Sequence, residues 1–258
     1  MNIYIPKLTL IGAGPGDAEL ITVKGLKAIQ NAKVILYDAL VAKSLLKEAK
    51  NAIKICVGKR AGQPSIKQDS IHEMIVRYAF EYGNVVRLKG GDSFVFGRGS
   101  EEKRHAELYG INVEVIPGIS SAFAVPASAG IPVTERNTSE GVWVITGTTK
   151  TNQISSDIAL AAKSKSTVVI LMGTRKLSQI VSIFQNEKKG ALPVAIIQNG
   201  TTRAQKQVAG TIDDIESLSK SKGIGAPGII IIGEVVRNTL EISQLSELVY
   251  EKEQSSQA

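Results

Sequence analysis

The residues best suited to chemistry lie together in one stretch, 85–99, where an apolar run gives way to a glycine-rich loop. The run is rich in β-branched residues and predicts a buried strand that ends at Gly90-Gly91-Asp92. Two residues without a Cβ atom let the backbone turn sharply and approach a ligand closely. Beyond them come two aromatic rings and Arg98, which supply ring surface and a fixed cation. Because open α/β sheets bind ligands beyond the carboxyl ends of their strands, the stretch indicates a binding loop rather than a plain surface turn.

A second glycine-rich loop, 12–17, follows the apolar run 8–11 near the start of the chain. It is similar to the dinucleotide pattern G-x-G-x-x-G, but the position of the third glycine holds Asp17, and Pro15 stiffens the turn. A carboxylate there would put negative charge where a pyrophosphate is normally held. The loop therefore argues against NAD and favours a ligand without phosphates, which could be cationic.

Composition limits the class of protein. The chain has 258 residues, 43% hydrophobic and 21% charged, which is enough for two modest domains with packed cores. Its one cysteine, Cys56, excludes a disulfide framework, and its two histidines, His72 and His105, are expected on different helices, so no metal site is expected.

Charge and hydropathy bear on partners and location. The net charge of +7 indicates an acidic partner, and because the basic residues are spread along the chain, a small polyanion is favoured over nucleic acid. No apolar run approaches the roughly 20 residues of a membrane span, and no leader pattern opens the chain, so no membrane partner and a cytoplasmic location are expected.

Strands and helices alternate in both halves, which predicts an α/β protein of two α/β domains with mostly parallel sheets. The domains are expected at 1–118 and 119–245, with a polar tail at 246–258. The helix at 67–82 has one apolar stripe at spacings of three and four, and His72, off that stripe, is expected in solvent. The other expected elements are strands at 8–11, 33–37, 53–57, 113–116, 142–145, 167–172, 194–198 and 229–232, a short antiparallel addition at 207–210, and helices at 22–29 and 101–109.

Several short motifs stand in the order and spacing of one family. They are the segments 12–17, 36–38, 58–60, 85–99, 117–120, 130–134, 172–174 and 233–236. Together they resemble the tetrapyrrole methylases, over nearly the whole chain, and the long stretch 85–99 resembles the members that act on uroporphyrinogen III. The resemblance implies the tetrapyrrole methylase fold, with the active site in the cleft between the two domains, and a homodimer.

The implied reaction moves methyl groups from S-adenosyl-L-methionine to two ring carbons of uroporphyrinogen III. It gives precorrin-2 through precorrin-1, with S-adenosyl-L-homocysteine as the other product and no metal, and it feeds sirohaem or cobalamin synthesis. Some relatives carry an extra oxidase–chelatase module, for which this chain has no room, so a stand-alone methylase is expected.

The family pattern also implies roles for individual residues. Asp38 and Lys59 match the positions of proton acceptor and proton donor, and Arg98 and Thr134 those of substrate contacts. A helix N-cap is the structural alternative for Asp38, and a solvated basic surface is the alternative for Arg98 and for other arginines that flank the motifs, such as Arg87. The positions implied for the cofactor are Pro15, Gly90, Gly91, Asp92, Val95, Ser120, Ser121, Met172 and Gly200.

Some of these assignments have rivals. Asp92 could be a turn former and Met172 a core residue at a strand end. Ser93 stands where the family pattern has proline, and Glu135 and Thr148 stand where it has histidine, which leaves details of the substrate open. Another precorrin methylase of the same fold remains an alternative, and so does a non-catalytic nucleotide-binding or RNA-binding protein.

Overall fold

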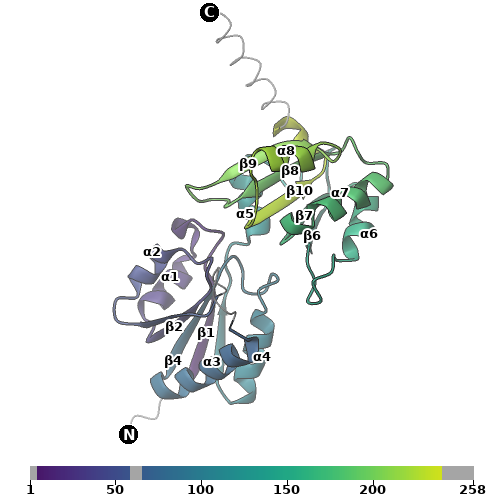
Figure 1. Ribbon diagram of the computed structural model, residues 1–258. Coiled ribbons are helices and arrows are strands. Elements are labelled where there is room, and N and C mark those ends of the chain that lie inside the picture. Colours follow the sequence, from purple (N-terminus) through teal and green to yellow (C-terminus); the bar gives the residue numbers. More distant parts are fainter. Residues whose placement is uncertain (1–4, 59–65, 240–258) are drawn as a thin grey trace, which may run out of the picture. The chain divides into compact units, whose positions relative to one another are not determined.

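The structure is a computed structural model that describes residues 5–58 and 66–239. The chain divides into two compact units, Met1–Ser121 and Ala122–Ala258, which are described separately (Figure 1). The predicted proton donor Lys59 and the predicted polar tail lie outside the described residues. None of the helices in the described part is long and apolar enough to cross a membrane.

The first unit is built on a five-stranded sheet of order β3-β2-β4-β1-β5, in which every neighbouring pair is parallel, as predicted. Two of the three central strands, β1 and β4, supply the predicted glycine loops at their carboxyl ends. The elements are β1 (Lys7–Gly12), α1 (Val23–Gln30), β2 (Val34–Tyr37), α2 (Lys43–Glu48), β3 (Ile53–Cys56), α3 (Gln68–Tyr82), β4 (Asn84–Lys89), α4 (Gly99–Leu108) and β5 (Asn112–Ile116).

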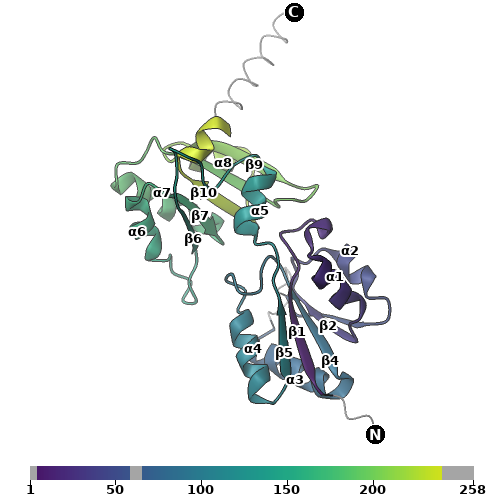
Figure 2. The same cartoon turned by 180° about the vertical axis from the view of Figure 1, so that it is seen from behind.

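Helices cover both faces of this sheet (Figures 1 and 2). Helices α3 and α4 bury Ile75 and Ala106 on one face, while α1 and α2 bury Ile29 and Leu45 on the other. Helix α1 starts where predicted, because the Thr22 hydroxyl accepts a hydrogen bond from the backbone N–H of the first turn. Both faces are therefore closed by apolar packing, which leaves the carboxyl ends of the strands for function.

The expectation that His72 lies in solvent is wrong. It is half-buried, and its ring stacks on His105 of α4, with 4.5 Å between the ring centroids. The two histidines come together because α3 and α4 pack side by side on the same face of the sheet. Among the described residues no group of three metal-ligating side chains is found, at this pair or elsewhere.

The second unit also holds a five-stranded sheet, of order β6-β7-β10-β8-β9, but the prediction of a mostly parallel sheet is wrong for it. Only β6 and β7 are parallel; the pairs β7–β10, β10–β8 and β8–β9 are antiparallel. The antiparallel addition predicted at 207–210 is present as β9. The elements are α5 (Ser121–Ser128), β6 (Val142–Thr146), α6 (Asp157–Lys163), β7 (Thr167–Leu171), α7 (Leu177–Asn186), β8 (Pro193–Gln198), β9 (Lys206–Thr211), α8 (Ile215–Ser221) and β10 (Gly228–Ile232).

Candidate active site

The loops after β1, β4 and β5 meet at the carboxyl end of the first sheet, in what we call the glycine junction: Gly12, Gly14, Gly91 and Gly118. A Cβ on Gly12 would lie 2.6 Å from both the Cα of Gly118 and the carbonyl oxygen of Gly91. Gly14 and Gly91, both with positive φ, exchange two backbone hydrogen bonds of 3.2 and 2.7 Å. The three loops thus approach one another more closely than residues with side chains would allow.

Asp92 ties two of these loops together. One carboxylate oxygen accepts a hydrogen bond from the N–H of Phe94 at 2.8 Å, and the other accepts one from the N–H of Gly118 at 2.9 Å. The turn-forming role considered for Asp92 is therefore real. Each carboxylate oxygen keeps a second lone pair that can accept a further hydrogen bond, so these two bonds leave room for a ligand. The contact between Asp92 and a ligand stays a prediction.

The other residues predicted to contact the cofactor in this unit surround the same junction. Gly91 lies next to Ser121, because a Cβ on Gly91 would be 3.7 Å from the backbone nitrogen of Ser121. Among the described residues, a Cβ on Gly90 would meet only the side chain of Leu40, at 3.5 Å. Pro15, Val95 and Ser120 belong to the loops that adjoin this junction.

Asp17, which argued against a dinucleotide, has a local role. Its carboxylate accepts a hydrogen bond from the N–H of Glu19 at 2.9 Å and caps a short 3₁₀ helix, Ala18–Leu20. The first glycine loop therefore ends in a carboxylate-capped turn.

The predicted base, Asp38, follows β2 and does not cap a helix, since α2 begins only at Lys43. Its side chain is 31% exposed, and its Oδ1 atom lies 2.5 Å from Nη2 of Arg87. Its Oδ2 atom lies 3.9 Å from Nζ of Lys89. Asp38 is thus a half-exposed carboxylate held from one side by two cations.

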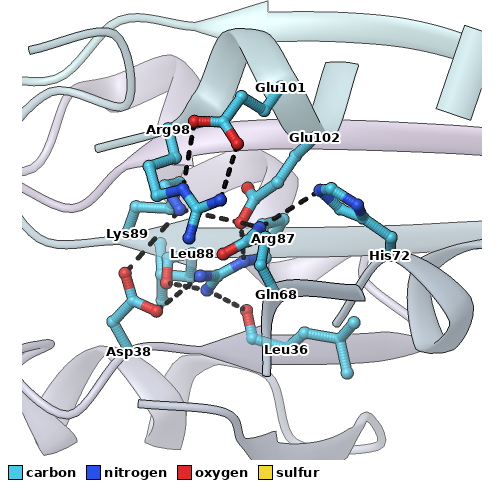
Figure 3. Close-up of polar contacts among 10 residues, drawn as sticks. All are labelled: Leu36, Asp38, Gln68, His72, Arg87, Leu88, Lys89, Arg98, Glu101 and Glu102. Carbon is cyan, nitrogen blue, oxygen red and sulfur yellow. Dashed lines mark hydrogen bonds and ion pairs between the residues drawn. The ribbon is translucent and has the colours of Figure 1, made fainter. Parts of the chain in front are cut away.

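Arg87 and Lys89 are both buried, so the solvated basic surface considered for Arg87 is wrong. Figure 3 shows the polar contacts that these two side chains make. Arg87 donates from Nε to Glu102 at 3.1 Å and from Nη1 to the carbonyl oxygens of Leu36 and Leu88, both at 3.3 Å. The guanidinium plane is therefore fixed by β2, β4 and α4 together. It cannot reach a substrate without breaking these bonds.

Glu102, which the sequence analysis did not single out, is completely buried in the first turn of α4. Its Oε1 atom accepts hydrogen bonds from Arg87, from Lys89 at 3.0 Å and from the Gln68 amide at 3.1 Å. The same Gln68 nitrogen lies 3.2 Å from Nε2 of His72, and Figure 3 marks this contact with a dashed line. We call Asp38, Arg87, Lys89 and Glu102 the charge cluster.

The cluster holds two cations and two carboxylates, so its charges balance. Burial, and next the neighbouring Arg87, lower the pKa of Lys89; Glu102 and Asp38 act in the opposite direction. Removing a carboxylate would therefore leave Lys89 poorly compensated in a dry environment.

The predicted substrate residue Arg98 has a left-handed backbone conformation and an exposed side chain. It forms a two-pronged pair with Glu101, with N–O distances of 3.0 and 2.6 Å, and the hydrogen bond to Glu101 raises the pKa of Arg98. Since the guanidinium is in solvent, this pair would have to open or rearrange for Arg98 to bind a substrate carboxylate.

In the second unit, Met172 follows β7 with φ of 56° and is 52% exposed, so it is not the core residue considered as an alternative. Its carbonyl oxygen accepts a hydrogen bond from the hydroxyl of Thr148 at 3.0 Å. Gly200 is buried, and a Cβ there would lie 2.3 Å from Val125 of α5. Thr134 is exposed. The ligand contacts assigned to these residues stay predictions.

Comparison with known proteins gives consistent matches. A family model of tetrapyrrole (corrin/porphyrin) methylases matches residues 7–216. The chain is 48% identical over 233 residues to the uroporphyrinogen-III C-methyltransferase of Methanocaldococcus jannaschii, and the matched region covers 89% of this chain and 96% of that protein. It is 41% identical to a siroheme synthase of Cronobacter sakazakii, of which it spans 49% of the length.

Solved structures give the same picture. The uroporphyrin-III C-methyl transferase of Thermus thermophilus, complexed with S-adenyl homocysteine, matches with a TM-score of 0.78 and 33% identity over 90% of this chain and 99% of that chain. A cobalt precorrin-4 methyltransferase matches with a TM-score of 0.80 and 28% identity, over 89% of this chain and 95% of that chain.

Proposed function

Because the chain belongs to the tetrapyrrole methylase family, we propose that it transfers methyl groups from S-adenosyl-L-methionine to two ring carbons of uroporphyrinogen III, giving precorrin-2 through precorrin-1. The observation that carries the proposal is the 48% identity to a uroporphyrinogen-III C-methyltransferase over almost the full length of both chains. The similarity to a structure complexed with S-adenyl homocysteine supports the cofactor. A homodimer is proposed from the resemblance.

The glycine junction fits a ligand such as S-adenosyl-L-methionine. In the part of the chain that the structure describes, a Cβ at Gly91 would meet only the backbone nitrogen of Ser121 within 4 Å, so backbone atoms stand close to the surface of this loop. Backbone groups and the carboxylate of Asp92 suit the hydroxyl and ammonium groups of the ligand, and the loop needs no cation for a pyrophosphate, because the ligand has none. When bound, the ligand supplies an electrophilic methyl group.

Once a ring carbon has gained a methyl group, the macrocycle must lose a proton from another of its atoms, and Asp38 is the proposed acceptor. Its carboxylate is half-exposed, while Arg87 and Lys89 hold it from the buried side, so it is oriented and still accessible. Arg98 and Thr134 are proposed to contact the substrate. Lys59 remains the proposed proton donor.

A second candidate is a methylase that acts on a later ring intermediate. The match to cobalt precorrin-4 methyltransferase, at 28% identity, supports it. The two candidates share the cofactor and differ in the substrate, so the mass of the product separates them.

The test is anaerobic incubation of the protein with uroporphyrinogen III and methyl-labelled S-adenosyl-L-methionine, followed by mass spectrometry of the product. We expect a gain of two methyl groups, and a large loss of rate in Asp38→Ala, since a general base contributes about 100- to 10,000-fold. Normal rates in Asp38→Ala would show that Asp38 is not the base. Cofactor binding without methylation would favour the second candidate, and absence of both would refute the proposal.

A further inference from the structure

We propose that Glu102 is a positioning residue for Asp38: from the buried side it holds Arg87 and Lys89, and so keeps the Asp38 carboxylate oriented and able to accept a proton. The inference rests on the proposed function, because it concerns the base of that reaction. It assigns a catalytic consequence to a side chain that is fully buried and that cannot itself touch a substrate.

The first step is the cost of the cluster. A buried ion pair is often no more stable than apolar side chains of the same size, so stability alone does not explain two cations and a carboxylate in a protein interior. Arg87, Lys89 and Glu102 are at most 4% exposed as side chains, whereas Asp38 is 31% exposed. Asp38 is therefore the one member of the cluster through which these buried charges can act on a ligand.

The second step is geometry. Arg87 donates from Nε to Glu102 of α4 and from Nη2 to Asp38, which follows β2. Glu102 therefore fixes the direction from which the guanidinium group of Arg87 meets the carboxylate of Asp38. Lys89 is shared in the same way, at 3.0 Å from Glu102 and 3.9 Å from Asp38. Without Glu102 both cations would turn to Asp38, the other carboxylate of the cluster.

The third step is charge. A carboxylate that faces two uncompensated cations binds a proton less readily and is a weaker base. Glu102 offsets one of the two positive charges, and the position of its carboxylate in the first turn of α4 suits its negative charge. The groups that face Glu102 are Arg87 and Lys89 from β4 and Gln68 from α3, with His72 behind Gln68.

The experiment uses Glu102→Gln, which keeps an oxygen for the three donors and removes the charge. Its amide nitrogen can take the place of Oε2, which has no hydrogen-bond partner among the described residues. Glu107→Gln is the matched control: it is the same change on the same helix, at an exposed residue paired with Lys103. Single-turnover methylation is measured against pH for the wild type and both variants, together with the KM for uroporphyrinogen III.

We expect Glu102→Gln to slow the plateau rate by about tenfold, to move the acid limb of the profile to lower pH and to change KM little, while Glu107→Gln matches the wild type. The double variant Lys89→Met with Glu102→Gln removes one cation with the carboxylate and should recover at least about a third of the lost rate. Recovery separates charge balance from damage to the fold, because a purely structural role predicts that the double variant is no better than the single one.

Three outcomes would overturn the inference: a Glu102→Gln profile identical to the wild type, a loss confined to KM, or a double variant no faster than Glu102→Gln. If the wild type itself adds no methyl groups to uroporphyrinogen III, the proposed function fails instead. The two failures are therefore distinguishable.

Discussion

Gly118→Ala is the sharpest test of how the candidate site is built. The added Cβ would lie 2.4 Å from the carbonyl oxygen of Gly91 and 2.6 Å from backbone carbons of Gly12. Ordinary van der Waals contacts of a Cβ begin at about 3.4 Å. All of these neighbours are backbone atoms at the ends of central strands, so no side chain can rotate away to relieve the overlap.

The cost of Gly118→Ala should therefore reach the upper end of the range for overpacking, about 3 kcal/mol. With a urea dependence of about 1–3 kcal/mol per molar, the midpoint of unfolding should fall by about 1–3 M. The substitution should also weaken the hydrogen bond from the N–H of this residue to Asp92, because the loop after β5 must move away.

Gly90→Ala is the matched control, since within residues 5–58 and 66–239 its Cβ would meet only the side chain of Leu40 at 3.5 Å, an ordinary contact. We expect a change of less than about 1 kcal/mol for it. Urea unfolding followed by far-ultraviolet circular dichroism gives the midpoints, and hydrogen exchange with mass spectrometry localises the loss of protection to β1, β4 and β5. Equal stability of the two variants would refute the close approach of the three loops.

Two further predictions concern single side chains of the first unit. Ser93 is buried, and its hydroxyl has no hydrogen-bond partner in the described part of the chain. Calorimetry of Ser93→Ala should therefore show a free energy of unfolding that is unchanged or raised by up to about 1 kcal/mol. A clear loss of stability would mean that the hydroxyl has a partner. Burial and the nearby His105 lower the pKa of His72 below its usual 6.5. As the pH falls below about 6.5, His72 is therefore protonated in the unfolded chain before it is protonated in the folded protein, and the folded state loses stability. His72→Phe keeps a ring on His105 and should weaken this loss between about pH 8 and pH 5 in urea titrations, whereas an unchanged pH dependence would contradict the assignment.

Much of the first unit could be predicted from the sequence because its signals are local. The helix expected at 67–82 is observed as Gln68–Tyr82, since apolar residues at spacings of three and four define a helix face wherever it packs. The glycine loop was predicted in the same way, because Gly90-Gly91-Asp92 ends an apolar run, and the positive φ of Gly91 favours glycine at that position.

Strand direction in the second unit was not predictable by the same means. The run at 229–232 is continuously apolar, which is typical of parallel strands covered on both faces. In the structure β10 is also buried along its length, but it pairs antiparallel with both neighbours. Burial on both faces therefore produced the apolar pattern, and that pattern contains no information on direction.

The charge cluster shows which further information would have been needed. Side chains alternate along a strand, so Arg87 and Lys89 of β4 point to the same face of the sheet, the face covered by α3 and α4. The parallel register pairs Tyr37 with Leu88, which brings the next residue, Asp38, beside Lys89. Two cations at alternate positions of a strand covered on both faces require carboxylate partners, and the sequence offered that signal. Only the order of the strands and the position of α4 identify those partners as Asp38 and Glu102, and for that reason Glu102, only three residues beyond the long motif, was not singled out from the sequence.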